Sequence, residues 1–296
     1  MKKIIFMAVI SAFVLGFSSC NNEENPVEEI QKSTALVVRT DIQTRATISE
    51  FTRGAELGLF VTAGALGYDY NSKSSYSNVR STYAGTYWEQ SPAVYLNNVP
   101  AQVFAYYPYD ASISNGKAVP VEHLTQKDYM YGTHSEGQNS INNLNPVVQL
   151  TMRHALALIV FQFDNCDFSG TGNIMQVGIM NAPDKKVLFS EGTMDISTGI
   201  ITGSEGKNAA AVTNEIEKKQ FVKLMVLPTK IASTGDLVVQ FKIDGKVYMW
   251  KVPEKTTWAG GTKNTYTVKL SDKKITVGNV IIKDWEAGVN EFAYLN

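Results

Sequence analysis

The sequence has few cysteines, no excess charge of either sign and no long apolar run. Only two of its 296 residues are cysteines, Cys20 and Cys166. The first is interpreted below as a lipidation site, which leaves no pair for an intramolecular disulfide bond. Lysine and arginine number 27 against 28 aspartates and glutamates, so the chain lacks the basic field that nucleic-acid binding requires. No segment reaches the roughly eighteen apolar residues of a transmembrane helix.

The composition is that of a globular protein without a nucleic-acid partner. Hydrophobic residues make up 44% of the chain and charged residues 19%, which excludes intrinsic disorder. The length allows two domains of roughly 150 residues each. We therefore expect the fold to be stabilised by hydrophobic burial.

The amino terminus has the pattern of an export signal. Lys2 and Lys3 precede an apolar run from Ile4 to Phe17, which is typical of a secretory signal because it is short for a membrane span. The run ends in Leu15-Gly16-Phe17-Ser18-Ser19-Cys20. This resembles the lipobox of bacterial lipoproteins, in which the cysteine thiol is acylated, although Phe17 replaces the commoner leucine. We interpret residues 1–19 as a signal peptide and Cys20 as the lipidated residue; the alternative is an ordinary signal peptide that contains a cysteine.

An acidic segment follows the cysteine. Residues 20–32 include Asn21 to Glu29, which is rich in glutamate and interrupted by Pro26, and such a segment cannot bury enough apolar surface to fold. We expect a flexible tether. It is either a spacer alone or similar to the acidic signal that carries lipoproteins of some anaerobic Gram-negative bacteria to the outer face of the cell.

Residues 33–45 alternate between apolar and polar side chains. Leu36, Val38, Thr40 and Ile42 share one face, which predicts a half-buried β-strand. The strand is followed by Thr44-Arg45-Ala46, and an exposed bond between Arg45 and Ala46 would suit a trypsin-like protease. Such bonds occur in any chain, so this signal is weak by itself.

Short β-prone segments separated by turn residues fill the rest of the chain. Ile243-Asp244-Gly245-Lys246 predicts a two-residue hairpin turn, because Asp-Gly tolerates the positive φ that such turns require. The regular spacing of the segments predicts an all-β fold with β-sandwich architecture. A shift in composition near Asn145-Pro146 divides it into an N-terminal domain over residues 33–145 and a C-terminal domain over residues 146–296. The clearest strands are predicted over 57–61, 94–96, 103–107, 147–152, 155–163, 174–180, 221–227, 237–243 and 246–252.

Six motifs occur in an order and spacing that resemble the fimbrillins, the subunits of type V pili. They are Phe104-Ala105-Tyr106-Tyr107-Pro108-Tyr109, Gln126-Lys127-Asp128-Tyr129-Met130-Tyr131-Gly132, His154-Ala155-Leu156-Ala157, Leu227-Pro228-Thr229, Trp258-Ala259-Gly260-Gly261-Thr262-Lys263-Asn264-Thr265-Tyr266 and Ile282-Lys283-Asp284-Trp285. The resemblance covers nearly all of the mature chain. It implies two transthyretin-like β-sandwich domains in tandem, synthesised as a lipoprotein precursor. It also implies removal of an amino-terminal segment by an arginine-specific protease, with Arg45-Ala46 where that site would lie.

No residue pattern indicates catalysis, a cofactor or a metal. The three histidines, His123, His134 and His154, lack the spacing of a zinc site, and His154 is better explained as a hydrogen-bonded structural residue. Cys166 is flanked by Asp164 and Asp167, which disfavour a reactive thiolate. Nucleophile elbows, phosphate loops and dinucleotide motifs are missing from the sequence. We therefore expect a protein that is not an enzyme.

Two functions remain in competition. The first is a structural or accessory subunit of an adhesive fimbrium at the outer membrane and cell surface, whose partners are other fimbrial subunits, the outer membrane through the lipid anchor, and host proteins or glycans. The second is an outer-membrane glycan-binding lipoprotein, because nine of the fourteen tyrosines fall between Tyr68 and Tyr109 together with Trp88. In that case the aromatic rings would stack on sugars; otherwise they fill the core.

If residues 33–45 are removed, the vacated groove of Leu36, Val38 and Ile42 would accept a strand from a neighbouring subunit. The carboxyl-terminal region is the candidate donor. Ile275 and Val277 alternate with polar residues, Gly278 suits a bulge, Val280 and Ile282 resume the pattern, and Val289 and Phe292 follow in a tail. The alternative is that residues 274–285 form an edge strand of their own domain, which leaves the tail as the donor.

Lipidation at Cys20 predicts that Cys20→Ala releases the protein from membranes, because the acidic tether offers no other anchor. Fractionation of cells that express the variant measures this release. Membrane partition equal to that of the unchanged protein would contradict lipidation.

Overall fold

The structure is a computed structural model, which describes residues 33–42, 51–72, 76–204, 210–216, 221–271 and 274–285. The regular elements in these ranges are β-strands, together with the short 3-10 helix η2 (Gly116–Ala118). The all-β prediction is therefore confirmed. Among the described residues, no helix has the length and apolar character needed to cross a membrane.

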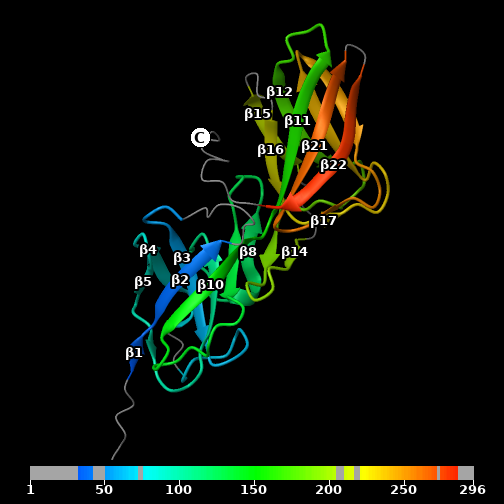
Figure 1. The fold of residues 1–296 in the computed structure, drawn as a ribbon. Helices are drawn as coiled ribbons and strands as arrows, with labels where there is room; N and C mark the ends of the chain where they lie inside the picture. Colours follow the sequence, from blue (N-terminus) through cyan, green and yellow to red (C-terminus); the bar gives the residue numbers. More distant parts are fainter. Residues whose placement is uncertain are drawn as a thin grey trace, which may run out of the picture. The chain divides into compact units, whose positions relative to one another are not determined.

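Seven strands from the first 154 residues close into a barrel with the order β10-β2-β5-β4-β3-β7-β9. The pair β2–β10, side by side in Figure 1, is parallel, and the other neighbouring pairs are antiparallel. Inward-facing side chains from these strands form one buried hydrophobic cluster. The bounds of the strands are β2 (Val37–Ile42), β3 (Glu56–Thr62), β4 (Val79–Tyr83), β5 (Trp88–Ser91), β7 (Gln102–Tyr107), β9 (Met130–His134) and β10 (Val147–His154).

This barrel corrects the prediction of a sandwich in the amino-terminal half. A sandwich needs two separate sheets, whereas here β2 pairs with both β10 and β5 and so joins the two ends of a single sheet. An alternating strand has the same sequence pattern in either architecture, since one face is buried in both. Sheet pairing also crosses the predicted boundary at Asn145-Pro146, because β10 follows it and belongs to the barrel.

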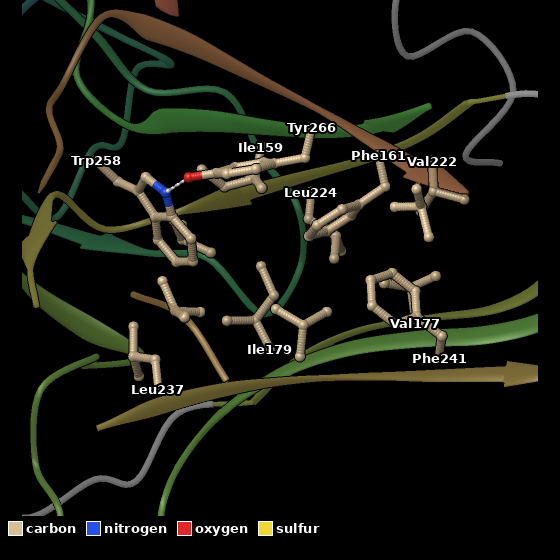
Figure 2. Close-up of a cluster of buried hydrophobic side chains, with 14 of the residues drawn as sticks. Ile159, Phe161, Val177, Ile179, Val222, Leu224, Leu237, Phe241, Trp258 and Tyr266 are labelled. Carbon is tan, nitrogen blue, oxygen red and sulfur yellow. Dashed lines mark hydrogen bonds between the residues drawn. The ribbon is translucent and has the colours of Figure 1, made fainter. Parts of the chain in front are cut away.

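The carboxyl-terminal half contains two four-stranded sheets, with the orders β16-β11-β21-β22 and β15-β12-β18-β19. Side chains from both sheets meet in one cluster (Figure 2), as expected for a sandwich. Within it, Phe161 and Phe241 pack edge to face at 5.1 Å, and the Trp258 indole donates a 2.8 Å hydrogen bond to the Tyr266 hydroxyl. The bounds are β11 (Ala157–Asp167), β12 (Ile174–Asn181), β15 (Ala210–Ile216), β16 (Phe221–Val226), β18 (Leu237–Ile243), β19 (Lys246–Lys251), β21 (Thr262–Ser271) and β22 (Ile275–Asp284).

The Asp-Gly hairpin between β18 and β19 is confirmed. Ile243 pairs with Lys246, and the two residues between them have φ values of 47° and 78°. The Asp244 carboxylate also accepts hydrogen bonds from the backbone N–H groups of Gly172 and Asn173, both at 2.9 Å. The turn therefore also fixes the loop that precedes β12.

Smaller sheets connect the remaining segments. β13 pairs with β14 and with β8, so residues on both sides of the predicted domain boundary share one sheet. β1 pairs with β6, and β17 pairs with β20. The bounds are β1 (Thr34–Ala35), β6 (Tyr95–Leu96), β8 (Val119–Glu122), β13 (Glu191–Met194), β14 (Ile201–Gly203), β17 (Thr229–Lys230) and β20 (Thr257–Trp258).

The segment after β8 binds the backbone at the end of β16. The Gln126 side-chain amide donates to the Met225 carbonyl at 2.9 Å and accepts from the Met225 N–H at 2.7 Å. Leu227 N–H donates to His123 Nδ1 at 3.3 Å. His123 is fully buried, and burial lowers its pKa from 6.5 to about 4. The imidazole is therefore neutral in the fold and accepts a backbone hydrogen bond.

The depressed pKa of His123 predicts a loss of stability in acid. The unfolded histidine takes up a proton near pH 6.5 and the folded one only near pH 4, so the unfolded state binds more protons between these values. The free energy of unfolding should fall as the pH falls through this window, by up to about 3 kcal/mol.

Urea unfolding at pH 6.5 and pH 4.5 measures this fall. His123→Gln is the matched variant, because glutamine keeps a hydrogen-bond acceptor but does not titrate. The fall should be smaller in the variant. An equal fall in the two proteins would show that His123 does not cause it.

Candidate functional site

The predicted removable strand lies in the wall of the barrel. Leu36 and Val38 are buried in the barrel core, and Ile42 is partly buried against it. Arg39 and Asp41, which alternate with them, are exposed. The predicted inward face of this strand is therefore the face that the structure buries.

The backbone of β2 is held strongly on one side and weakly on the other. Its parallel pairing with β10 runs over six residue pairs, from Val37 opposite Val147 to Ile42 opposite Met152. On the other side, the ladder with β5 consists of the single pair Val38 and Trp88. Just before β2, the Leu36 N–H donates to the Val94 carbonyl at 2.9 Å.

Trp88 supplements this weak side with a side-chain hydrogen bond. Its indole Nε1 donates to Thr40 Oγ1 at 3.0 Å, and the residue is only 1% exposed. The indole packs against Phe51, with ring centroids 5.0 Å apart, and against Tyr83 at 4.9 Å. The sequence marks Trp88 only as part of the aromatic-rich stretch. The one feature of the sequence that points to this hydrogen bond is Thr40, which places a hydroxyl on the otherwise apolar face of the strand.

Removal of β2 would change the barrel in two ways. The backbones of β5 and β10 would each lose the strand that covers them, so a closed sheet would become an open one with two edges. The inward side chains of β10, Val148, Leu150 and Met152, are fully buried and would face the resulting groove. Such a groove offers backbone hydrogen bonds and an apolar floor, which is the chemistry that binds an extended strand.

The predicted donor strand occupies a place in its own sheet. β22 is an edge strand that pairs antiparallel with β21, and Ile275, Val277 and Val280 are partly buried against the sandwich core. Ile282 is 55% exposed. The register shifts between Val277 and Val280, which confirms the predicted bulge at Gly278. The structure thus has the arrangement that the sequence left as the alternative for residues 274–285.

The chain is fixed where β22 ends. Trp285 is buried, and its backbone N–H donates to the Gly261 carbonyl at 2.7 Å. Its indole stacks on the His154 imidazole, with centroids 4.1 Å apart and ring planes 13° apart. His154 Nδ1 in turn lies 2.9 Å from Asp128 Oδ1. His154 is therefore a structural residue, as predicted, and any segment beyond residue 285 starts from a fixed point.

The other two histidines also have structural partners. His134 Nε2 accepts a 2.9 Å hydrogen bond from the Val103 N–H, and burial lowers the pKa of His134. His123 accepts the bond from Leu227 described above. In the part of the chain that the structure describes, no group of histidine, cysteine, aspartate and glutamate side chains is arranged to hold a metal ion.

Much of the aromatic-rich stretch fills the barrel and its surroundings. Tyr70, Tyr76 and Tyr106 are buried, and their hydroxyls donate hydrogen bonds to Val99, Tyr95 and Asp110 carbonyls. Tyr68 and Tyr95 are 67% and 53% exposed. The remaining predicted site residues, Cys20, Arg45, Ala46, Val289 and Phe292, lie outside the described residues.

Comparison with known proteins places these features in a family. The Fimbrillin-like family matches residues 44–285. No curated protein matches the chain. Solved structures share the fold: a Bacteroides uniformis protein named for cell adhesion has a TM-score of 0.65 at 19% identity, over 85% of this chain and 99% of its own. A Bacteroides ovatus protein with the same designation has a TM-score of 0.65 at 15% identity, over 87% and 99%.

The C-terminally truncated tip fimbrial protein Mfa3 of Porphyromonas gingivalis is also similar. Its TM-score is 0.51 at 12% identity, over 86% of this chain and 100% of its own. At these identities the three structures establish a common fold. The family match extends from residue 44, just after β2, to Trp285 at the end of β22. The chain therefore belongs to the fimbrillin-like family.

Proposed function

We propose that this protein is a structural or accessory subunit of a cell-surface fimbrium and that it assembles by strand exchange once residues 1–45 have been removed. The observation that carries the proposal is the position of β2. It closes the barrel core, yet it is the first long strand among the described residues and ends three residues before Arg45, the first residue of the Arg45-Ala46 bond. One cut there, followed by release of the segment, would open the barrel without interrupting any other strand that the structure describes.

The energy available from refilling the groove supports polymerisation. Burial of side chains such as Leu36, Val38 and Ile42 contributes roughly 1.5 to 3 kcal/mol each, or about 5 to 9 kcal/mol together before the ordering costs of association. The segment 1–45 contains five basic and five acidic residues, so its removal leaves the net charge unchanged. The cut would act through packing and strand pairing instead of charge.

The donor strand in this proposal is the tail after Trp285, which contains Val289 and Phe292. Ile275, Val277, Val280 and Ile282 remain the alternative donor, but their use would require β22 to leave its eight residue pairs with β21. Use of the tail would leave the pairs between β22 and β21 in place. The tail would start from Trp285, which is held by Gly261 and His154.

Export of the precursor as a lipoprotein with Cys20 acylated would bring the subunit to the outer membrane and the cell surface. Its partners would then be other fimbrial subunits, in line with the name of the similar tip fimbrial protein Mfa3. Membership in a fimbrillin-like family and the proposed strand exchange agree in requiring contact between subunits.

Cleavage at Arg45 predicts that surface protein begins at Ala46. Amino-terminal sequencing of filaments measures this end. Arg45→Ala should block the cut, whereas Arg53→Ala, a change at an exposed turn eight residues further on, should not. Assembled filaments whose subunits begin at Cys20 would contradict the proposal.

Strand exchange predicts that cleaved protein forms linear oligomers whose length rises with concentration. Deletion of Gly288 to Asn296 should leave a folded monomer that cannot donate, because it removes most of the tail and no residue of β22. Electron microscopy and light scattering measure the oligomers. Normal filaments from the cleaved, truncated protein would rule out the tail as the donor.

A further inference from the structure

We infer that Trp88 sets the register of the strand that fills the barrel between β5 and β10, by requiring a hydrogen-bond acceptor at the third inward position of that strand. The inference rests on the proposed strand exchange and adds a rule for which sequences fit. In the structure described here the third inward position is Thr40, after Leu36 and Val38. The specificity-determining group is the indole N–H of Trp88.

The surroundings of Trp88 leave its N–H dependent on the strand in the groove. The indole nitrogen can only donate a hydrogen bond. Trp88 is 1% exposed, and its indole N–H donates to Thr40 Oγ1 at 3.0 Å. Trp88 pairs through its backbone with Val38, and its indole packs against the aromatic rings of Phe51 and Tyr83. A replacement strand without an oxygen at the Thr40 position would bury this donor without a partner, which is costly.

Backbone pairing alone cannot choose the register. A strand that slips by two residues beside β10 keeps the same ladder and the same inward face, because side chains alternate with a period of two. β5 contributes one residue pair, so it adds little discrimination. Apolar side chains in the groove tolerate exchange among similar sizes. A buried N–H distinguishes an oxygen from a methyl group and therefore separates the correct register from its neighbours.

On the face of the tail that carries Val289, one residue meets this rule in either strand direction. When Val289 faces inward, Glu291 lies two residues further on the same face, next to Ala293 and Leu295, and Phe292 lies on the opposite face. Whether the tail runs parallel or antiparallel to β10, the register that keeps apolar residues on both sides of the third position places Glu291 there. Thr40 is only partly buried, so a carboxylate at this position would stay close to water. We assign Glu291 as the acceptor for Trp88 of the neighbouring subunit.

The first test uses the full, uncleaved chain, in which β2 occupies the groove. Thr40→Val removes the acceptor with little change of shape, and Thr40→Ser keeps it. Denaturant unfolding should show that Thr40→Val lowers the folding equilibrium constant about tenfold more with Trp88 present than in a Trp88→Phe background. Thr40→Ser should show no such dependence on Trp88. Equal effects of Thr40→Val in both backgrounds would overturn the inference.

The second test uses Arg45-cleaved protein and measures the rate of filament growth by light scattering. Glu291→Val should slow growth about tenfold, Glu291→Gln should not, and Trp88→Phe should make the three proteins alike. Equal rates for the valine and glutamine variants with Trp88 present would overturn the assignment of Glu291. If the cleaved wild type forms no filaments, the proposed function fails, and the first test then decides whether Trp88 selects the residue at position 40.

Discussion

Strand β2 closes the barrel by pairing with β10 over six residue pairs and with β5 at one. The rest of the amino-terminal half depends on this closure, because β10 and β5 would otherwise be sheet edges and the core behind β2 would be open on one side. Leu36 and Val38 complete a cluster whose other members come from all six remaining strands. A cut at the Arg45-Ala46 bond lies outside β2, but loss of β2 after that cut would open the whole barrel.

The two neighbours of β2 bind it in different ways. The β10 side provides a continuous ladder that would accept any extended strand in several registers. The β5 side provides one backbone pair and the hydrogen bond between Trp88 and Thr40. Affinity for a strand thus arises mainly from β10 and the apolar floor, whereas discrimination between strands arises from Trp88. This separation would suit the proposed strand exchange, in which the groove holds one sequence before assembly and a different one afterwards.

The carboxyl-terminal sheet has edges that are less open to pairing. At β16, the Gln126 amide occupies the Met225 backbone groups. At β22, a bulge at Gly278 and the exposed Lys283 interrupt the regular edge, and both features oppose edge-to-edge association. Trp285, stacked on His154 and bonded to Gly261, ends the strand at a fixed place.

Local sequence was sufficient to find strands and their faces. Alternation at Leu36, Val38 and Ile42 identified the buried face of β2, and Asp244-Gly245 identified a hairpin, because side-chain period and turn conformation depend on residues that are adjacent in the chain. Gly278 marked a bulge for the same reason. Family motifs from Phe104 to Trp285 identified the fimbrillin likeness.

Which strands are neighbours depends on the tertiary structure. The closed barrel joins β2 to β10, more than one hundred residues later in the chain, and Trp88 meets Thr40 across 48 residues. The stack of His154 on Trp285 and the bonds from Gln126 to Met225 are likewise long-range. Backbone hydrogen bonds are chemically alike in every strand pair, so local sequence does not specify which strands pair. The sequence alone was sufficient for the strands, their buried faces and the family. The pairing of particular strands, and with it the position of Trp88 beside Thr40, depends on the packing of the whole chain.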